Sequence, residues 1–352
     1  MPDINKHSAD EFLEEFRKDS GNAPLALYTG AALHRAGRLD EAAAVWTIGH
    51  DESGVLRHLH KMPEIQGDLR EFSLLADKSI AEHFTGMHRE TVMRVAAETG
   101  ADLSRVLAGV WPHFATEPFR YRADGQRPDT FYMPDLEAKP VWPGGEFAWA
   151  AALQDAAETI RSEYLAAAGL EHVPCIAPNA QDVKWARLSG SDDWAAINLY
   201  FNAARQPEAE HFPATFATLT STPLLTRDDV PLEVMFSRMR PDVEIPPHCG
   251  LTNTRLTVHL PIIAPEGSAF RIASNRFDWG LDAPIIIDDS FLYEAWNGSD
   301  EDFVALTFKI PHPHLAAAEL MAIEAVYDRF DSWVADRIDR LGIIHPDAPT
   351  KS

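Results

Sequence analysis

A change of pattern near residue 173 limits the fold of this chain more than any other feature of the sequence. Beyond this point, short apolar runs are separated by proline, glycine, asparagine and aspartate. Runs of this length, divided by turn-forming residues, are typical of strands in a β-sandwich or barrel. The expected strands are 195–202, 232–240, 254–263, 269–274, 283–290 and 303–310. We therefore expect a β-domain over residues 173–320.

The chain before residue 120 has helical periodicity instead. Between residues 25 and 50, Gly30, Gly37 and Ala42 alternate with larger apolar side chains. This pattern predicts a helical hairpin that resembles a tetratricopeptide helix pair. Because one repeat cannot bury its own apolar face and no second copy is evident, an ordinary hairpin packed on its neighbours explains the pattern equally well. Further helices are expected over 68–84, 88–99 and 102–110.

A segment rich in proline and glycine connects the two regions. Its composition forbids a regular helix, and the aromatic side chains of Phe131, Tyr132 and Trp142 predict that it packs against the protein. An amphipathic helix is expected over 148–168, and another helix closes the chain. The expected fold class is α+β. Its expected parts are a helical region at 1–120, the connector and a helix at 121–172, the β-domain at 173–320, and a C-terminal helix and tail at 321–352.

The composition argues against several kinds of partner. The formal net charge is −23, from 54 acidic and 31 basic residues, and such a surface repels nucleic acid and anionic lipid. No apolar stretch approaches the roughly 20 residues of a membrane span, and the N-terminal residues lack the apolar core of a signal peptide. Cys175 and Cys249 are the only cysteines, so no disulfide framework is expected. We therefore expect a cytoplasmic protein, with its oligomeric state left open.

Two motifs in the β-region resemble those of a known family. The first is HCGLTNTRLTVHL at 248–260, and the second is DDSFLYEAWN at 288–297. In this order and spacing they resemble the aspartyl/asparaginyl β-hydroxylases, a branch of the iron(II)- and 2-oxoglutarate-dependent oxygenases. The resemblance implies a double-stranded β-helix of the jelly-roll or cupin type. It also implies a dioxygenase that hydroxylates a small-molecule or peptide substrate.

The resemblance further implies roles for individual residues. His248 matches the proximal metal histidine of the family, and a neutral imidazole is a suitable ligand for iron(II). His259 matches the histidine that contacts the C1 carboxylate of 2-oxoglutarate, while Ser237 and Trp194 match residues of the co-substrate pocket. Arg255 matches the arginine of the first motif, and its role is open.

The sequence departs from the family pattern at three of its functional positions. Tyr293 stands where the family has its distal metal histidine, and a phenol with a pKa near 10 must lose its proton before it ligates a metal well. Phe303 stands where the family has the arginine that pairs with the C5 carboxylate of 2-oxoglutarate. Thr257 replaces a second arginine, which is found in the hydroxylases that act on proteins.

Other side chains are candidates for the missing roles. Lys309 has the same strand parity as Phe303 but lies about 20 Å further along, too far to replace an arginine there. Arg271 or Arg276 could reach the pocket from another strand. For Asp288 and Asp289, a structural role in the turn of the second motif is favoured over catalysis.

Three functions are compatible with these residues. In the first, the chain is an iron(II) oxygenase with altered ligation at His248 and Tyr293. In the second, the fold persists as a non-catalytic binding or regulatory module. In the third, the pocket takes a different co-substrate or supports different chemistry. The sequence lacks the G-x-S-x-G, G-x-x-x-x-G-K-[ST] and G-x-G-x-x-G motifs, which sets unrelated hydrolases and kinases aside.

Overall fold

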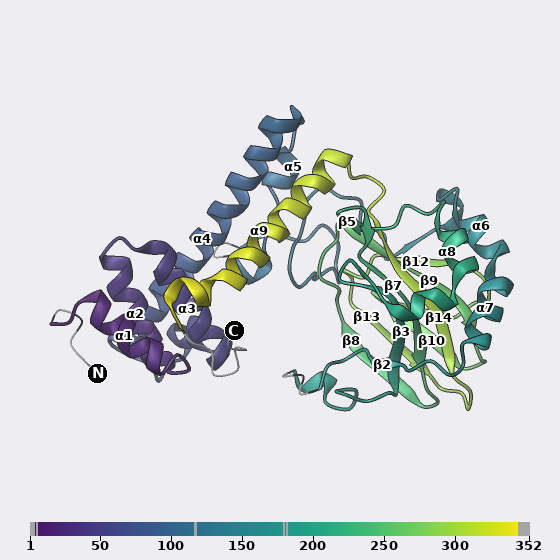
Figure 1. The fold of residues 1–352 in the computed structure, drawn as a ribbon, viewed down its shortest axis with the longest axis horizontal. Coiled ribbons are helices and arrows are strands. Elements are labelled where there is room, and N and C mark those ends of the chain that lie inside the picture. Colours follow the sequence, from purple (N-terminus) through teal and green to yellow (C-terminus); the bar gives the residue numbers. More distant parts are fainter. Residues whose placement is uncertain (1–3, 5, 116–117, 179, 181, 344–352) are drawn as a thin grey trace, which may run out of the picture. The chain divides into compact units, whose positions relative to one another are not determined.

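The computed structural model describes residues 4, 6–115, 118–178, 180 and 182–343. These residues form two compact units, which are drawn in Figure 1 and described separately below. The helical unit comprises the described residues of 1–107, 114–119 and 317–352, and the sheet unit comprises 108–113 and 120–316. The C-terminal helix therefore groups with the N-terminal helices. Among the helices of the described residues, none has the length and hydropathy needed to cross a bilayer.

The helical unit contains six α-helices among its described residues. They are α1 (Ala9–Lys18), α2 (Ala23–Arg35), α3 (Leu39–Ser53), α4 (Asp68–Thr99), α5 (Ser104–Leu107) and α9 (Ala317–Leu341), with a short 3-10 turn at Leu56–Lys61. The prediction of two helices over 68–84 and 88–99 was wrong, because α4 runs through Gly86 without a break. A single glycine inside a helix costs only about 1 kcal/mol, which the packing of a long helix readily offsets.

The hairpin of α2 and α3 depends on a close approach of two helices. A Cβ atom added at Gly30 would lie 2.2 Å from Nε1 of Trp46, so only glycine fits at this position. Helix α9 packs against α4, where the ring of Phe330 lies 4.9 Å from that of Phe84. Trp333 of α9 also donates a hydrogen bond of 2.7 Å to Asp40. The helical hairpin is thus present, and its likeness to a tetratricopeptide pair stays a prediction.

The sheet unit consists of two antiparallel sheets with a small β-ribbon. The larger sheet has the order β1-β12-β9-β14-β7-β3-β2, with β4 paired to β3, and the smaller has the order β11-β10-β13-β8. The strands of the larger sheet are β1 (Val141–Trp142), β2 (Val173–Pro174), β3 (Trp194–Phe201), β4 (Ala204–Arg205), β7 (Glu233–Met239), β9 (Arg255–Ile263), β12 (Ile285–Ile287) and β14 (Phe303–Pro311). Those of the smaller are β8 (Val243–His248), β10 (Ser268–Ile272), β11 (Asn275–Asp278) and β13 (Tyr293–Asn297), and the ribbon pairs β5 (Thr226–Arg227) with β6 (Val230–Pro231). This is the expected α+β fold with a double-stranded β-helix of the cupin type.

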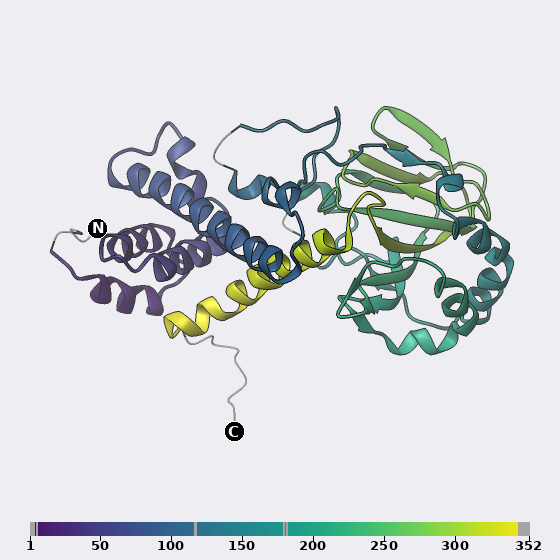
Figure 2. The same cartoon turned by 90° about the horizontal axis from the view of Figure 1, so that it is seen from above.

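Helices cover one face of the larger sheet and leave the other face to the interior. The covered face packs against α6 (Ala150–Asp155), α7 (Ala157–Ala166) and α8 (Pro213–Leu219) (Figures 1 and 2). Because side chains alternate along a strand, Val304, Leu306 and Phe308 of β14 meet the helices, whereas the residues between them face the smaller sheet. The helix expected over 148–168 is divided at Ala156 into α6 and α7.

The connector packs down on the sheet unit, as its aromatic residues predict. Phe131 and Tyr132 are buried, and Phe131 forms a bridge to Thr252. The backbone of Met133 exchanges two hydrogen bonds of 2.8 Å with the side-chain amide of Asn253. The connector therefore holds the turn that follows His248.

Candidate functional site

A cavity of about 820 Å³ lies between the two sheets of the sheet unit. The larger sheet supplies most of its wall, and Ile245, His248 and Tyr293 enter from the smaller sheet. The residues that line it include Trp194, Glu233, Ser237, Met239, His248, Thr257, His259, Trp279, Asp289, Tyr293, Phe303, Thr307 and Lys309. Most of the sequence-predicted site residues are thus brought together at one cavity.

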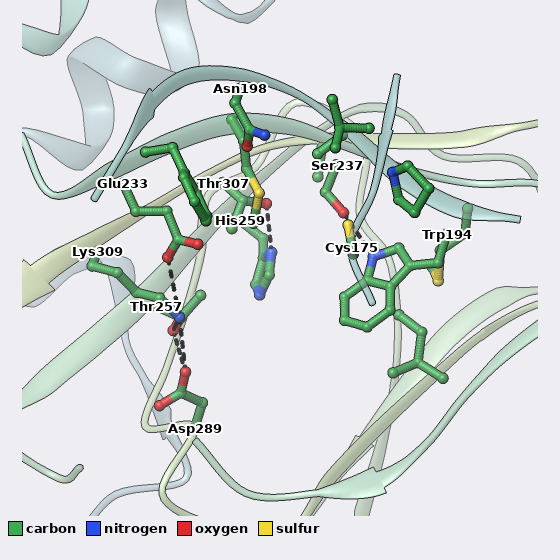
Figure 3. A pocket seen from close by; sticks show the side chains of 18 of the residues that line it. Cys175, Trp194, Asn198, Glu233, Ser237, Thr257, His259, Asp289, Thr307 and Lys309 are labelled. Carbon is green, nitrogen blue, oxygen red and sulfur yellow. Dashed lines mark hydrogen bonds and ion pairs between the residues drawn. The ribbon is translucent and has the colours of Figure 1, made fainter. Parts of the chain in front are cut away.

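Strand register divides the cavity into two chemically different ends. Across the larger sheet, Trp194 pairs with Met239, and Met239 pairs with Phe303. These residues and Trp279, whose ring lies 4.9 Å from that of Phe303, form what we call the aromatic end. Further along β7 and β14 lie Glu233 and Lys309. Together with Thr257, the partner of Lys309 on β9, and with Asp289, which follows β12, they form what we call the polar end. Figure 3 shows the polar end on one side and Trp194 on the other, with His259 between them.

His248 ends strand β8 and lines the cavity, and one of its ring nitrogens is hydrogen-bonded to the backbone of the same strand. Its Nδ1 lies 2.9 Å from the carbonyl oxygen of Pro246, which can only accept, so Nδ1 carries the proton of the neutral ring. Burial lowers the pKa of His248, which keeps the imidazole neutral near pH 7. The rings of Trp185 and Tyr293 lie 5.1 and 5.6 Å away. Nε2 is therefore the atom that can bind a cation or a ligand.

His259 stands in the middle of the cavity on strand β9. Its Nδ1 lies 3.0 Å from Oγ1 of Thr307, its register partner on β14. Burial, and then the charge of Lys309, lower the pKa of His259 to about 3, so the ring is neutral. It can offer a ligand one hydrogen bond but no charge.

Tyr293 faces His248 directly across the smaller sheet. The two residues are register partners, and the ring of Tyr293 stacks parallel to that of His259 at 6.4 Å. Burial, and then the negative charge of Asp289, raise the pKa of Tyr293 well above its usual value. The side chain is therefore a neutral phenol and a poor ligand for a metal.

Asp289 brings a carboxylate into the cavity, where the sequence indicated a structural role in a turn. Its Oδ2 accepts hydrogen bonds from Thr257 at 2.7 Å and from Lys309 at 2.9 Å. Although burial acts to raise it, the charges of Lys309 and Arg255 and the bonds to this oxygen lower the pKa of Asp289 to about 2. Among the described residues, its buried Oδ1 has no hydrogen-bond partner.

The same carboxylate lies against Gly250. A Cβ atom added at this glycine would lie 2.3 Å from Oδ1 of Asp289. Asp289 therefore occupies the space that a side chain two residues after His248 would take. Asp288, by contrast, turns into the core, where its hydrogen bonds to Ser290 and Gln126 have the structural role that was expected.

At the aromatic end, Trp194 and Ser237 form one hydrogen bond. Nε1 of Trp194 donates to Oγ of Ser237 at 3.1 Å. The end is closed by Phe303, which is buried against Trp279. Among the described residues that line the cavity, Lys309 is the only lysine or arginine, and it lies at the polar end.

The remaining arginine candidates lie outside the cavity. Arg271 is on the other face of β10, where it forms an ion pair of 2.5 Å with Glu294. Arg276 pairs with Asp278 at 3.0 Å. Arg255 does not line the cavity, although its charge acts on Asp289. The suggestion that Arg271 or Arg276 reaches the pocket was wrong, because the alternation of side chains on β10 turns Phe270 and Ile272 inward instead of Arg271. Arg276 of β11 is the cross-strand partner of Arg271 and does not line the cavity either.

Sequence reasoning missed Lys309 and Asp289 as cavity residues. Distance along one strand correctly separates Lys309 from Phe303, but it does not reveal that Lys309 pairs across the sheet with Thr257. The available signal was a lysine inside the apolar run 303–310, since such a residue needs a buried partner. Among the described residues, no group of three or more histidines, cysteines and acidic residues could hold a metal ion.

Comparison with known proteins finds similarity over most of the sheet unit. The family model for aspartyl/asparaginyl beta-hydroxylase matches residues 154–313. An ornithine lipid ester-linked acyl 2-hydroxylase from Rhizobium tropici is 30% identical over 178 residues, which cover 47% of this chain and 58% of that protein. The human aspartyl/asparaginyl beta-hydroxylase is 28% identical over 141 residues, which cover 40% of this chain and 18% of that protein.

Solved structures give a weaker likeness. An oxidoreductase of the 2OG-Fe(II) oxygenase family from Burkholderia pseudomallei is 15% identical and superposes with a TM-score of 0.31, covering 52% of this chain and 97% of that one. The fold assignment therefore rests on the strand order and on the family match. Residues 154–313 thus match the aspartyl/asparaginyl β-hydroxylase family, as the two sequence motifs predict, and identities of 28 to 30% to these two proteins are those of a divergent relative.

Proposed function

We propose that the sheet unit is a divergent hydroxylase that oxidises a small molecule held in this cavity. The observation that carries the proposal is the pairing of His248, oriented by Pro246, with the unsatisfied Oδ1 of Asp289 in one cavity. A neutral imidazole nitrogen and an ionised carboxylate are the two donor types that iron(II) oxygenases use. The family match supports oxidation as the chemistry.

The residues fit an iron(II) ion only if the second ligand differs from the family pattern. Nε2 of His248 and Oδ1 of Asp289 would hold the ion, while Tyr293 stays a neutral phenol because burial raises its pKa. Bound iron(II), together with O₂ and 2-oxoglutarate, would supply the oxidation of a C–H bond. The protein's own part is to keep His248 neutral and to hold Asp289 ionised, with the rings of Trp185 and Tyr293 packed beside His248.

The co-substrate fits less well at the aromatic end. His259 and Ser237 can offer hydrogen bonds to an oxoacid beside the ring of Trp194, as their family counterparts imply. Phe303, however, presents a ring where a second carboxylate would need a cation. Binding of 2-oxoglutarate in the family's orientation would therefore lose a charge-assisted pair.

A non-protein substrate is favoured by the cavity wall. Met235, Met239 and Ile245 give it a flexible apolar surface, which suits an alkyl or acyl group. Thr257 stands where protein-modifying relatives have an arginine. The name of the Rhizobium tropici relative, an acyl 2-hydroxylase, is consistent with such a substrate.

A non-catalytic binding module is the second candidate. It is favoured by the joint replacement at Tyr293 and Phe303, which removes one family anchor for iron and one for 2-oxoglutarate. In this case the cavity would bind a ligand without turning it over.

Metal analysis separates the two candidates. The protein is purified without oxygen, loaded with iron(II), and analysed with and without 2-oxoglutarate beside the variants His248→Ala and Asp289→Asn. The hydroxylase proposal expects near-stoichiometric iron that both variants lose, and conversion of 2-oxoglutarate to succinate by the parent. Absence of bound iron in the parent would refute it and leave the binding module.

A further inference from the structure

We propose that Lys309 anchors the carboxylate of the ligand in this cavity, at the polar end and not beside Phe303. The inference rests on the proposed function only in taking this cavity as the ligand site. It assigns the ligand a chemical class, a carboxylic acid with an apolar remainder. It also fixes the orientation of that ligand in the cavity. Neither metal binding nor turnover is needed for it to be tested.

The position of the ammonium group is the first argument. The side chain of Lys309 is 13% exposed and lines the cavity beside Thr257 and Asp289. Its Nζ donates to Oγ1 of Thr257 at 2.7 Å and to Asp289 at 2.9 Å. Since a lysine ammonium has three donors, one N–H remains for a ligand.

The charge balance at the polar end is the second argument. Lys309 is not the only cation that stabilises the negative charge of Asp289, because the charge of Arg255 also acts on this carboxylate. The carboxylate of Glu233 lies 4.0 Å from Nζ, beyond hydrogen-bond distance. A ligand carboxylate could therefore approach Lys309 more closely than Glu233 does, and Thr307 brings a hydroxyl group to the same cavity.

The contrast with the other end is the third argument. Trp194, Met239, Phe303 and Trp279 offer two neutral indole N–H groups and no cation. The N–H of Trp194 is bonded to Ser237, and that of Trp279 has no hydrogen-bond partner among the described residues. A carboxylate placed there would lose its water without gaining a charged partner, whereas an alkyl group would gain by burial. A ligand with one acidic and one apolar part is therefore oriented with its acid at Lys309.

Calorimetric titration of the metal-free protein tests the proposal. The probes are 2-oxoglutarate, succinate and butyrate, with butyramide as the uncharged match of butyrate. We expect the acids to bind and the amide to bind at least about tenfold more weakly, since a charge-assisted hydrogen bond is lost. Lys309→Met should weaken acid binding about tenfold or more, and Lys309→Arg should retain most of it.

A charge moved across the register pair gives a sharper test. Thr257 is the cross-strand partner of Lys309, so Thr257→Arg combined with Lys309→Met places a cation beside the original one. This double variant should recover acid binding over Lys309→Met alone. Glu233→Gln should strengthen acid binding, because it removes a negative charge that faces the same ammonium. Arg271→Met is the control, since it removes a cation that lies outside the cavity.

Several outcomes would overturn the assignment. They are acid binding that is unchanged in Lys309→Met, equal binding of butyrate and butyramide, no binding of any acid by the parent, or weaker binding in Glu233→Gln. Thermal unfolding shows whether each variant is folded. If Lys309→Met is not folded, the comparison of butyrate with butyramide and the binding by Lys309→Arg still test the assignment. Because no metal is present, a protein that fails to bind iron can still pass this test, and an active hydroxylase can fail it.

Discussion

Strand β14 contributes an apolar side chain to one end of the cavity and a charged side chain to the other. At the aromatic end, Phe303 is buried on Trp279 and contributes apolar packing. At the polar end, Lys309 holds an ionised Asp289 and lies near Glu233. The comparison shows that apolar packing stabilises one end of the cavity, whereas the charged groups lie at the other end. The family pattern, by contrast, implies a cation where Phe303 stands.

The largest effect is expected at the aromatic end. Phe303→Ala should lower the free energy of unfolding by about 3 kcal/mol, because it removes a buried ring and enlarges a cavity. Denaturant unfolding measures the change. The control Leu281→Ala removes a side chain that is 51% exposed and should cost less than about 0.5 kcal/mol. Equal losses in the two variants would contradict the assignment of Phe303 to the core.

Acid is expected to lower the free energy of unfolding through the protonation of Asp289 at the polar end. The pKa of Asp289 is about 2 in the folded protein and near 4 in an unfolded chain, so its ionisation stabilises the fold above about pH 4. That contribution, on the order of 2 kcal/mol, is lost as the pH falls from about 4 to about 2. Denaturant unfolding between pH 5 and pH 2.5 should show a smaller acid-dependent loss in Lys309→Met than in the parent. The same loss in both would mean that Lys309 does not lower the pKa of Asp289.

Restoring two family residues should give the aromatic end a cation and the site a second imidazole. The double variant Tyr293→His with Phe303→Arg should gain iron affinity and 2-oxoglutarate consumption about tenfold over the parent, since it adds an imidazole ligand and a carboxylate partner. Iron titration and succinate release measure the two gains. Tyr293→Phe is the control and should gain neither. If the double variant gains neither, the pocket has changed at more than these two positions.

The smallest effect is expected outside the cavity. Arg271→Gln removes an exposed ion pair with Glu294 and should change the free energy of unfolding by less than about 1 kcal/mol. Its ligand binding should equal that of the parent. A clear loss of binding would show that the outer face of β10 takes part in the site after all.

Much of the sheet unit could be predicted from local sequence. The run 303–310 became β14, and 254–263 became β9, because alternating apolar residues between turn-forming residues specify a strand with few competitors. Strand β8 was not predicted, since it contains Pro246 and Pro247. Such residues suit an edge strand, which is where β8 lies in the smaller sheet.

The sequence alone determined the strands, the family motifs and the residues that depart from them, because each of these is written in short stretches of neighbouring residues. Only the tertiary structure decided that Lys309 bonds to Thr257, that Asp289 fills the space at Gly250, and that Arg271 faces away. These contacts join residues that lie 23 to 52 positions apart in the chain. They depend on the register between strands and on the direction in which each side chain alternates, and a one-residue shift would change all of them.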